Sequence, residues 1–147
     1  MTIFNVKTEE VLTQVADIVI WWNNNSETTD YHAISGHRNK LTALLAFLSE
    51  IFAREQVKND YKYIERKVTE AEIVSEYKEK IEVKSFAMAE RLTDKDERFI
   101  EAFKAQKDVE ANFERLKHLI RQCNAILLAM HQTISIAVKE KENTSHE

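Results

Sequence analysis

Four basic residues recur at every fourth position of one stretch of the chain, which makes this stretch the clearest candidate for chemistry. On a helix such spacing places the side chains along one slowly winding ridge. Tyrosines are interleaved with the basic residues, so a phosphate backbone would find cations while bases would find aromatic faces. The predicted residues for binding single-stranded DNA are Arg54, Lys58, Lys62, Arg66, Lys67, Tyr61 and Tyr63.

The basic charge is concentrated in this stretch. Residues 38–68 carry seven Lys and Arg against four Asp and Glu, a balance of +3, whereas the whole chain has a formal net charge of −4. The acidic remainder argues against indiscriminate binding to nucleic acids or membranes. With Glu50, Glu55 and Glu65 nearby, the same spacing is also typical of an ordinary solvated helix face. Both interpretations stay open. Because one chain offers few phosphate contacts, useful affinity would require an oligomer.

Signatures of catalysis are scarce. None of the five histidines has the spacing of a zinc site, and a chain with one glycine cannot build a phosphate-binding loop of the usual kind. Glu114 and His118 are four apart, but such a pair is typical of an exposed charged helix face. Glu76 and Glu79 supply only half of the acidic pattern expected in a helical nucleotide pyrophosphohydrolase. We predict a protein that is not an enzyme and has no cofactor and no metal.

The composition predicts an all-α fold. The chain has no proline and one glycine among 147 residues, and 31% of its residues are charged, whereas sheets and long loops need more turn residues. This length suggests a single helical domain over residues 1–147, with flexible ends at about 1–6 and 142–147. There is no signal peptide and no apolar run of membrane-spanning length. We therefore expect a cytoplasmic protein.

Two interleaved apolar series run through the last third of the chain. They follow heptad spacing from Phe99 to Ala137, with a polar interruption at Gln106, which predicts one long helix from Thr93 or Asp94 onward. Such a helix is too long for a compact monomer, so the expected fold is an elongated helical bundle with a long C-terminal heptad helix. The alternative is that partner subunits share the stripe. The single cysteine, Cys123, lies in the stripe as a small core residue.

Three further helices are expected before this one. The first begins near Thr8 and ends at three consecutive asparagines, residues 23–25, after an apolar end that contains Trp21 and Trp22. The second begins at Asp30 or after Gly36, and its apolar phase drifts near residues 52–57, where we expect a bend or a change of packing partner. A capping-box match at residues 69–72 predicts the start of a third helix at Thr69. Whether residues 69–92 form one helix or two is open.

Large apolar residues in the first and last helices predict a surface for self-assembly. The tryptophans end a segment that is apolar all round, which indicates burial on more than one side. The C-terminal heptads supply further surface. The predicted homo-oligomer interface consists of Trp21, Trp22, Phe113, Leu116, Ile120, Leu127, Met130 and Ile134.

Short patches of the chain resemble a known family. They are the run of residues 58–63 (KNDYKY), the pair Lys84-Ser85, and residues 92–96 (LTDKD) at the entry to the last helix. Together with the order of helices over residues 35–137, they resemble the UvsY-type recombination mediators of T-even-like bacteriophages. The connector between residues 64 and 83 is longer and more acidic than the family's pattern.

The resemblance implies a small helical protein that forms a ring-like homo-oligomer and binds single-stranded DNA. It also implies that the protein helps a RecA-like recombinase to displace a single-strand-binding protein. Arg54, Lys58 and Lys62 would contact DNA, and the last helix would mediate assembly. Arg66 and Lys67 have no matched position and are included because of their charge. The alternative is a helical structural, adaptor or inhibitor protein, phage-encoded in one version, that acts through protein–protein contacts at Ile20, Trp21 and Trp22.

Overall fold

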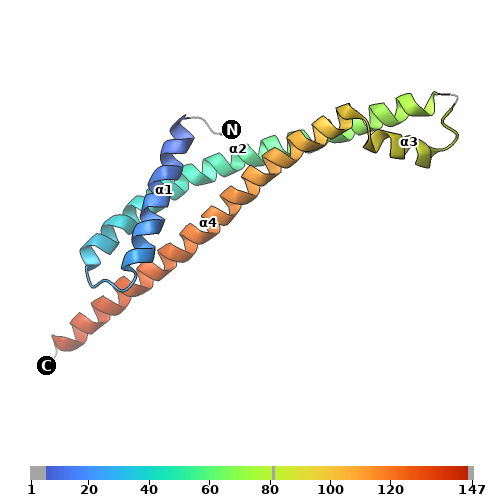
Figure 1. Ribbon diagram of the computed structural model, residues 1–147. Helices are drawn as coiled ribbons and strands as arrows, with labels where there is room; N and C mark the ends of the chain where they lie inside the picture. The colour runs from blue at the N-terminus through green and yellow to red at the C-terminus, as the bar shows by residue number, and fades with distance from the viewer. Residues whose placement is uncertain (1–5, 81, 146–147) are drawn as a thin grey trace. The chain divides into compact units, whose positions relative to one another are not determined.

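The computed structural model describes residues 6–80 and 82–145, and four helices account for most of them. They are α1 (Val6–Asn25), α2 (Tyr31–Lys78), α3 (Phe86–Asp94) and α4 (Glu97–Thr144) (Figure 1). The described residues contain no β-strand. The predicted all-α fold with a long C-terminal helix is confirmed, and α2 and α4 each have 48 residues.

Contacts divide the chain into two compact units. Unit 1 consists of Met1–Phe52 and Leu116–Glu147, and unit 2 of Ala53–Arg115. Both long helices therefore continue from one unit into the other. The boundary in α2 falls within the region where the drifting apolar phase predicts a change of packing partner.

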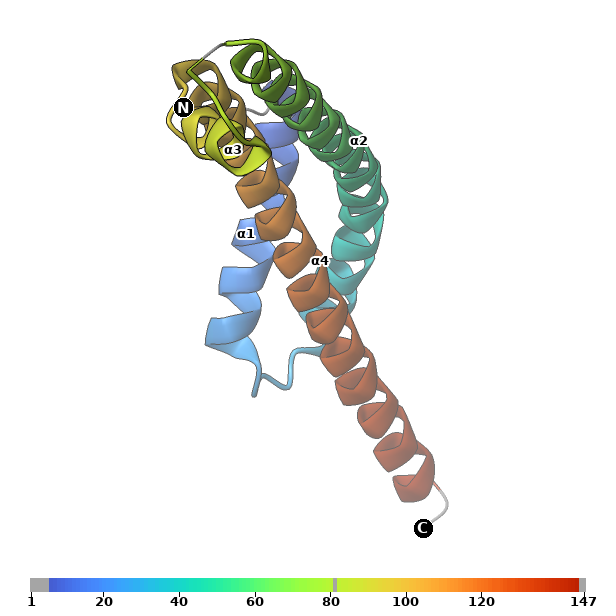
Figure 2. The ribbon, with the colours of Figure 1, turned by 90° about the vertical axis from the view of Figure 1, so that its right-hand side faces the viewer.

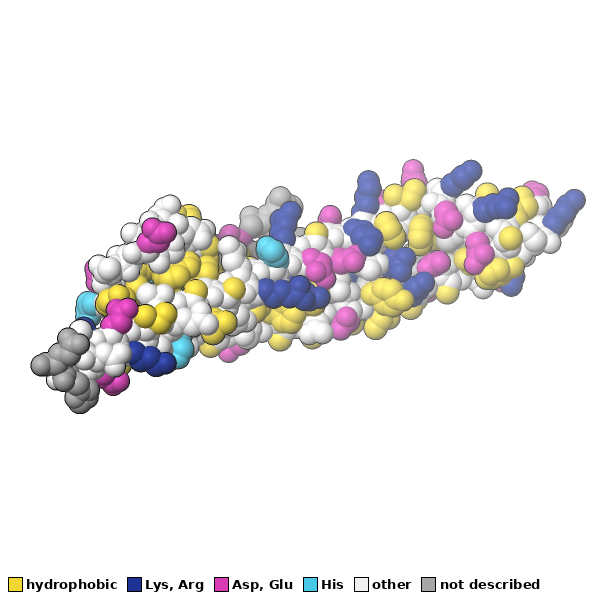
Figure 3. Space-filling model, turned by 90° about the horizontal axis from the view of Figure 1, so that it is seen from below, with side chains coloured by type: hydrophobic (Ala, Val, Ile, Leu, Met, Phe, Trp, Pro, Cys, Tyr) yellow, Lys and Arg dark blue, Asp and Glu magenta, His cyan; other side chains and the backbone are white. Residues whose placement is uncertain are grey.

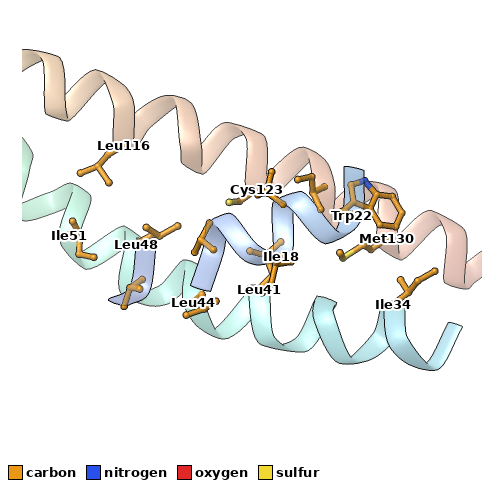
Figure 4. Packing of buried hydrophobic residues seen from close by; sticks show 14 residues of the cluster. Ile18, Trp22, Ile34, Leu41, Leu44, Leu48, Ile51, Leu116, Cys123 and Met130 are labelled. Carbon is orange, nitrogen blue, oxygen red and sulfur yellow. The ribbon is translucent and has the colours of Figure 1, made fainter. Parts of the chain in front are cut away.

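Unit 1 has a continuous apolar core built by three helices. α1 lies beside α2 and α4 there, and apolar side chains from all three point toward one another (Figures 2 and 4). Heptad spacing explains the contribution of α4, since Leu116, Cys123 and Met130 are seven apart and at most 2% exposed. The other buried members of the core are Val11, Val15, Ile18, Val19, Trp22, Ile34, Leu41, Leu44, Leu48, Ile51 and Ile126.

Polar side chains define the turn between α1 and α2. The side-chain amide of Asn25 donates to the carbonyl oxygen of Trp21 at 2.8 Å in the last turn of α1. Asp30 accepts from the backbone N–H of Ala33 at 3.0 Å, which satisfies one of the free donors at the start of α2. Of the two predicted starts of the second helix, the structure therefore has the one at Asp30.

Unit 2 contains far less buried apolar surface. It consists of the second part of α2, the nine-residue α3 and the first part of α4. Its buried apolar residues among those described are Ile73, Ala89 and Val109. Polar residues fill other buried positions, namely Glu55, Thr93, Gln106 and Asn112. The α2–α4 contact in unit 2 is thus a partly polar seam, and Gln106 lies within it.

Three boundaries differ from the sequence-based expectation. The predicted helix start at Thr69 is wrong, because α2 continues to Lys78 with no proline or glycine to end it. A separate helix begins instead at Phe86, where Ser85 accepts from the N–H of Met88 at 3.1 Å. Thr93 and Asp94 belong to α3, and α4 begins at Glu97 after Asp96.

The predicted flexible ends are only partly covered. Residues 1–5 and 146–147, and Ile81 between α2 and α3, lie outside the described residues. Val6 is the first residue of α1, and α4 includes residues 142–144.

A matched pair of leucine variants tests the core of unit 1. Leu48 is fully buried and Leu128 is 59% exposed. We expect Leu48→Ala to lower the free energy of unfolding by about 2–5 kcal/mol, because it leaves a cavity in the core. Leu128→Ala should change it by less than about 0.5 kcal/mol. Urea denaturation followed by circular dichroism measures both, and equal effects would contradict the packing described here.

Candidate nucleic-acid interface

The basic ridge of α2 winds around the helix. Because a step of four residues advances about 40° around a helix axis, the ridge turns from open surface toward α4. Arg54 and Lys58 are exposed, whereas Lys62 and Arg66 are half-buried. The four cations therefore do not form one flat row, and Arg66 is the member that meets α4.

Three of the predicted lysines pair with glutamates of the same helix. Lys58 contacts Glu55 at 3.0 Å, Lys62 contacts Glu65 at 2.8 Å, and Lys67 contacts Glu70 at 3.6 Å. The pairs of Lys62 and Lys67 are largely exposed, and such pairs contribute little to stability and exchange readily for other partners. Glu55 is only 3% exposed, so its carboxylate depends on Lys58. On the face shown in Figure 3, Lys and Arg side chains are interspersed with acidic and hydrophobic side chains.

The two tyrosines of the stretch belong to different sides of α2. Residues two apart differ by about 200° around a helix, so Tyr61 and Tyr63 point in nearly opposite directions. Tyr61 is 65% exposed and has the spacing of the apolar residues Val57, Ile64 and Val68. Tyr63 is 46% exposed and lies against basic side chains.

Five side chains of unit 2 form an alternating series of cations and aromatic rings. We call it the cation–ring ladder, and it consists of Lys67, Tyr63, Arg66, Phe103 and Lys107. The guanidinium carbon of Arg66 lies 5.3 Å from the centre of the Tyr63 ring and 5.5 Å from that of Phe103. Lys67 Nζ lies 5.9 Å from the Tyr63 ring, and Lys107 Nζ lies 5.5 Å from the Phe103 ring. These distances suit cation–π attraction.

Arg66 has no carboxylate partner among the described residues. Its Nε is buried and makes no hydrogen bond, and no acidic group of the described chain lies within ion-pair distance. A partly buried guanidinium without an anion leaves strong donors unused, and phosphate oxygens match its geometry. The centre of the ladder is therefore a guanidinium whose charge no carboxylate of the described residues balances.

Two of the five ladder residues, Phe103 and Lys107, were not predicted from the sequence. Phe103 and Lys107 lie on α4, outside both heptad series, and nothing in the sequence alone shows which α4 residues face Arg66. Phe103 is 38% exposed, and its ring centre lies 6.0 Å from that of Phe99. One signal was available: Phe99, Phe103 and Lys107 follow one another at steps of four.

The residues predicted for self-assembly lie mainly in the core of the single chain. Trp22, Leu116 and Met130 are buried there. Trp21 is partly buried and stacks on His37 with ring centres 4.0 Å apart. Ile120, Leu127 and Ile134 pack against the same core, and Phe113 is half-buried in unit 2. A role for these residues between subunits remains a prediction.

A polar network joins α2 to the start of α4 within unit 2. Arg98 pairs with Glu76 at 2.8 Å and with Asp96 through Nε at 3.1 Å. Tyr77 donates its hydroxyl to Asp96 at 3.0 Å, and Asp96 also accepts from the backbone N–H of Arg98 at 3.0 Å. Asp96 therefore caps α4 and links it to α2.

Arg98 dominates the electrostatics of this network. Its hydrogen bonds lower the pKa of Asp96 to about 2 and also lower the pKa of Glu76. The hydrogen bond to Asp96 raises the pKa of Tyr77. Glu76, one of the acids considered for catalysis, is thus held by an arginine. Among the residues that the structure describes, no group of three or more His, Cys, Asp and Glu side chains could hold a metal ion.

Comparisons with known proteins identify no family for this chain. No family model, no curated protein and no solved structure matches the chain. The resemblance to UvsY-type mediators therefore rests on the short patches and on the order of the helices. Within the described parts of the chain, no helix is long and apolar enough to cross a membrane.

The lowered pKa of Asp96 predicts a specific pH dependence of stability. The folded value is about 2, and the value in an unfolded chain is about 3.9. The carboxylate therefore stabilises the fold fully above about pH 4, and this contribution is lost as the pH falls toward 2. Urea denaturation between pH 2 and 5 should show a weaker decline for Asp96→Asn than for the wild type.

The neighbouring variant Asp94→Asn is the control, because Asp94 is exposed and lies at the end of α3. It should retain the decline of the wild type. An Asp96 pKa near the unfolded value, measured by NMR titration, would contradict the network.

Proposed function

We propose that the protein is a non-enzymatic mediator that binds single-stranded DNA and self-assembles. As the resemblance to UvsY-type proteins implies, it would help to load a RecA-like recombinase in competition with a single-strand-binding protein. The observation that supports DNA binding is the cation–ring ladder, with the unpartnered guanidinium of Arg66 between two partly exposed rings.

The ladder combines the two contacts that single-stranded nucleic acids require. Tyr63 and Phe103 are 46% and 38% exposed. A base that stacks on either ring would take the place of the exposed lysine over it, Lys67 or Lys107. Arg66, Lys67 and Lys107 lie within 6 Å of those rings, so phosphates flanking a stacked base would meet a cation. Stacking of this kind tolerates any sequence, since every base has an aromatic face.

The remaining cations of α2 extend the charged surface. Arg54 and Lys58 are exposed and Lys62 is half-buried. Lys62 would exchange its exposed partner Glu65 for a phosphate at little cost. Lys58 holds the buried carboxylate of Glu55, so it would contact a phosphate while keeping this ion pair. Tyr61 has no place in this contact, since it points away from Tyr63. The number of phosphate contacts per chain remains small, which is why the proposal includes self-assembly.

A helical adaptor that acts through protein contacts is the second candidate. Apolar side chains on α2 remain at the surface, with Val57 65%, Ile64 58% and Val68 51% exposed. This candidate predicts that changes in the ladder leave the function intact and that changes in exposed apolar residues abolish it.

Titration of a fluorescently labelled oligodeoxythymidine tests the DNA-binding proposal. Tyr63→Ala and Phe103→Ala should each raise the dissociation constant about 5- to 150-fold, which corresponds to the loss of one stacked base. Arg66→Gln should raise it about 10- to 100-fold through loss of a charged hydrogen bond. When the titration is repeated at several salt concentrations, the salt dependence of binding should be shallower by about 0.7 for each phosphate that a variant no longer binds.

Two matched variants control for general effects. Phe86 is 54% exposed and has Lys78 Nζ at 4.9 Å from its ring centre, but it lies outside the ladder. Arg38 is half-buried, like Arg66, but belongs to unit 1. Phe86→Ala and Arg38→Gln should bind like the wild type. Absence of binding at low salt, or binding unaffected by Arg66→Gln and Tyr63→Ala, would overturn the proposal.

A further inference from the structure

One side of α2 in unit 2 carries an exposed apolar stripe. Val57, Tyr61, Ile64 and Val68 follow one another at steps of four, three and four, and their exposed fractions are 65%, 65%, 58% and 51%. The small residues Ala53 and Ala71 continue the spacing at either end and are also exposed. We call this set the α2 stripe.

The α2 stripe faces away from the seam with α4. Glu55 and Ile73 are the buried positions of α2 in unit 2, and helical geometry places them on the side of the helix opposite to Val57 and Ile64. The stripe therefore cannot be covered by the contacts that hold α2 against α4. Apolar residues at heptad spacing are what a coiled coil presents to a partner helix.

We propose that the α2 stripe pairs with the same stripe of a second copy of this chain in antiparallel orientation. In this register Tyr61 faces Ile64 of the second copy, and Val57 faces Val68 of the second copy. The two-fold axis repeats each of these layers, so the stripe of one chain packs against the identical stripe of the other. Four apolar layers result from residues that one chain leaves exposed.

The charges that flank the stripe favour this pairing. On one flank, the antiparallel register places Lys58 opposite Glu65 of the second copy. On the other flank it places Asp60 opposite Lys67 of the second copy. Symmetry doubles both contacts, so four attractive pairs border the apolar layers. All four side chains are exposed, and the intrahelical pairs Lys62–Glu65 and Lys67–Glu70 exchange easily.

A parallel pairing of the same stripe would be less favourable than the antiparallel one. In a parallel coiled coil, the residue just before an apolar position of one helix faces the residue just after the next apolar position of the other helix. Asp60 would meet Glu65 of the second copy twice, and Arg54 would lie beside Arg54 of the second copy within the apolar layers. Lys67 would meet Glu72 of the second copy, so attraction and repulsion cancel at the flanks of a parallel pair, whereas all the flanking pairs of the antiparallel register attract.

The surface also has a recess at one end of the stripe. Ala53, Arg54, Val57 and Lys58 line a shallow hollow of about 380 Å³. In the antiparallel register, Val68 and Ala71 of the second copy approach this hollow. A projecting valine opposite a recess between neighbouring side chains is the packing expected when knobs fit into holes.

This pairing does not depend on DNA binding. The α2 stripe and the cation–ring ladder have no residue in common, and only Lys67 of the ladder borders the stripe. A pair of chains joined in this way would carry two ladders on one assembly, which multiplies the phosphate contacts.

Sedimentation velocity over a range of concentrations tests the proposal with a matched pair of isoleucines. Ile64 and Ile136 are both 58% exposed, but Ile136 lies on α4 in unit 1. Wild-type protein should associate, Ile64→Asp should raise the dissociation constant by more than about tenfold, and Ile136→Asp should behave like the wild type. A wild-type protein that stays monomeric, or an Ile64→Asp variant that associates like the wild type, would overturn it.

Charge exchange distinguishes the two orientations. In the antiparallel pair, Glu65→Lys replaces two attractive contacts by two repulsive ones and should weaken association about tenfold. Adding Lys58→Glu to the same chain should restore association. In a parallel pair, Glu65→Lys would instead remove repulsion from Asp60 and strengthen association. A stronger dimer with Glu65→Lys, or no rescue in the double variant, would overturn the antiparallel register.

Circular dichroism checks that each variant keeps its helices. The substituted side chains are exposed, but Lys58→Glu also removes the partner of the buried Glu55, so the thermal stability of the double variant is measured beside its association.

Titration of Ile64→Asp with the labelled oligonucleotide shows whether the pairing surface and the proposed DNA-binding surface are separate. With an oligonucleotide too short to reach two ladders, Ile64→Asp should lose association and bind as one wild-type chain does, which supports two separate surfaces. A longer oligonucleotide should bind Ile64→Asp more weakly than the wild type, because the second ladder is lost. If only the ladder variants lose oligonucleotide binding, the result concerns the proposed function and does not affect the proposed pairing.

Discussion

Two paired helices can bury only one side of each helix, and this limit sets the difference between the two units. In unit 1, α1 covers a second side of the α2–α4 pair, and a continuous apolar core results. In unit 2 the additional helix has only nine residues, and the seam contains Glu55, Gln106 and Asn112 in place of large apolar side chains. Aromatic and aliphatic residues of α2 and α4 therefore remain at the surface of unit 2, which is where binding surfaces can form.

Helical periodicity distributes these exposed residues over distinct sides of α2. Tyr63, Arg66 and Lys67 meet α4 residues in the cation–ring ladder, while Tyr61 belongs with Val57 and Ile64 in the α2 stripe. One helix thus carries both the surface that we propose for single-stranded DNA and the surface that we propose for a second copy of the chain. The Arg98 network ties α2 to the start of α4 and thereby holds the helix pair that carries both surfaces.

Periodicity in the sequence was sufficient to predict the fold class, the long last helix and the drift in α2. It could not place the end of α2, because the capping pattern at Thr69 is equally compatible with a helix interior when nothing interrupts the chain. The sequence-based prediction grouped Tyr61 with Tyr63 because they are neighbours in the sequence, although a helix points their side chains in nearly opposite directions. Phe103 and Lys107 were not predicted, because their place in the ladder depends on contact with Arg66. Arg66 is 37 positions away from Phe103 in the sequence, and only the tertiary structure brings the two residues together.

We propose that the cation–ring ladder contacts single-stranded DNA. Chemical-shift mapping of isotopically labelled protein during titration with a short oligodeoxythymidine tests it most directly. The largest changes should occur at Tyr63, Arg66, Phe103 and Lys107 and their neighbours, with unit 1 nearly unaffected. No change at saturating oligonucleotide, or changes centred on α1 and the C-terminal part of α4, would contradict the account.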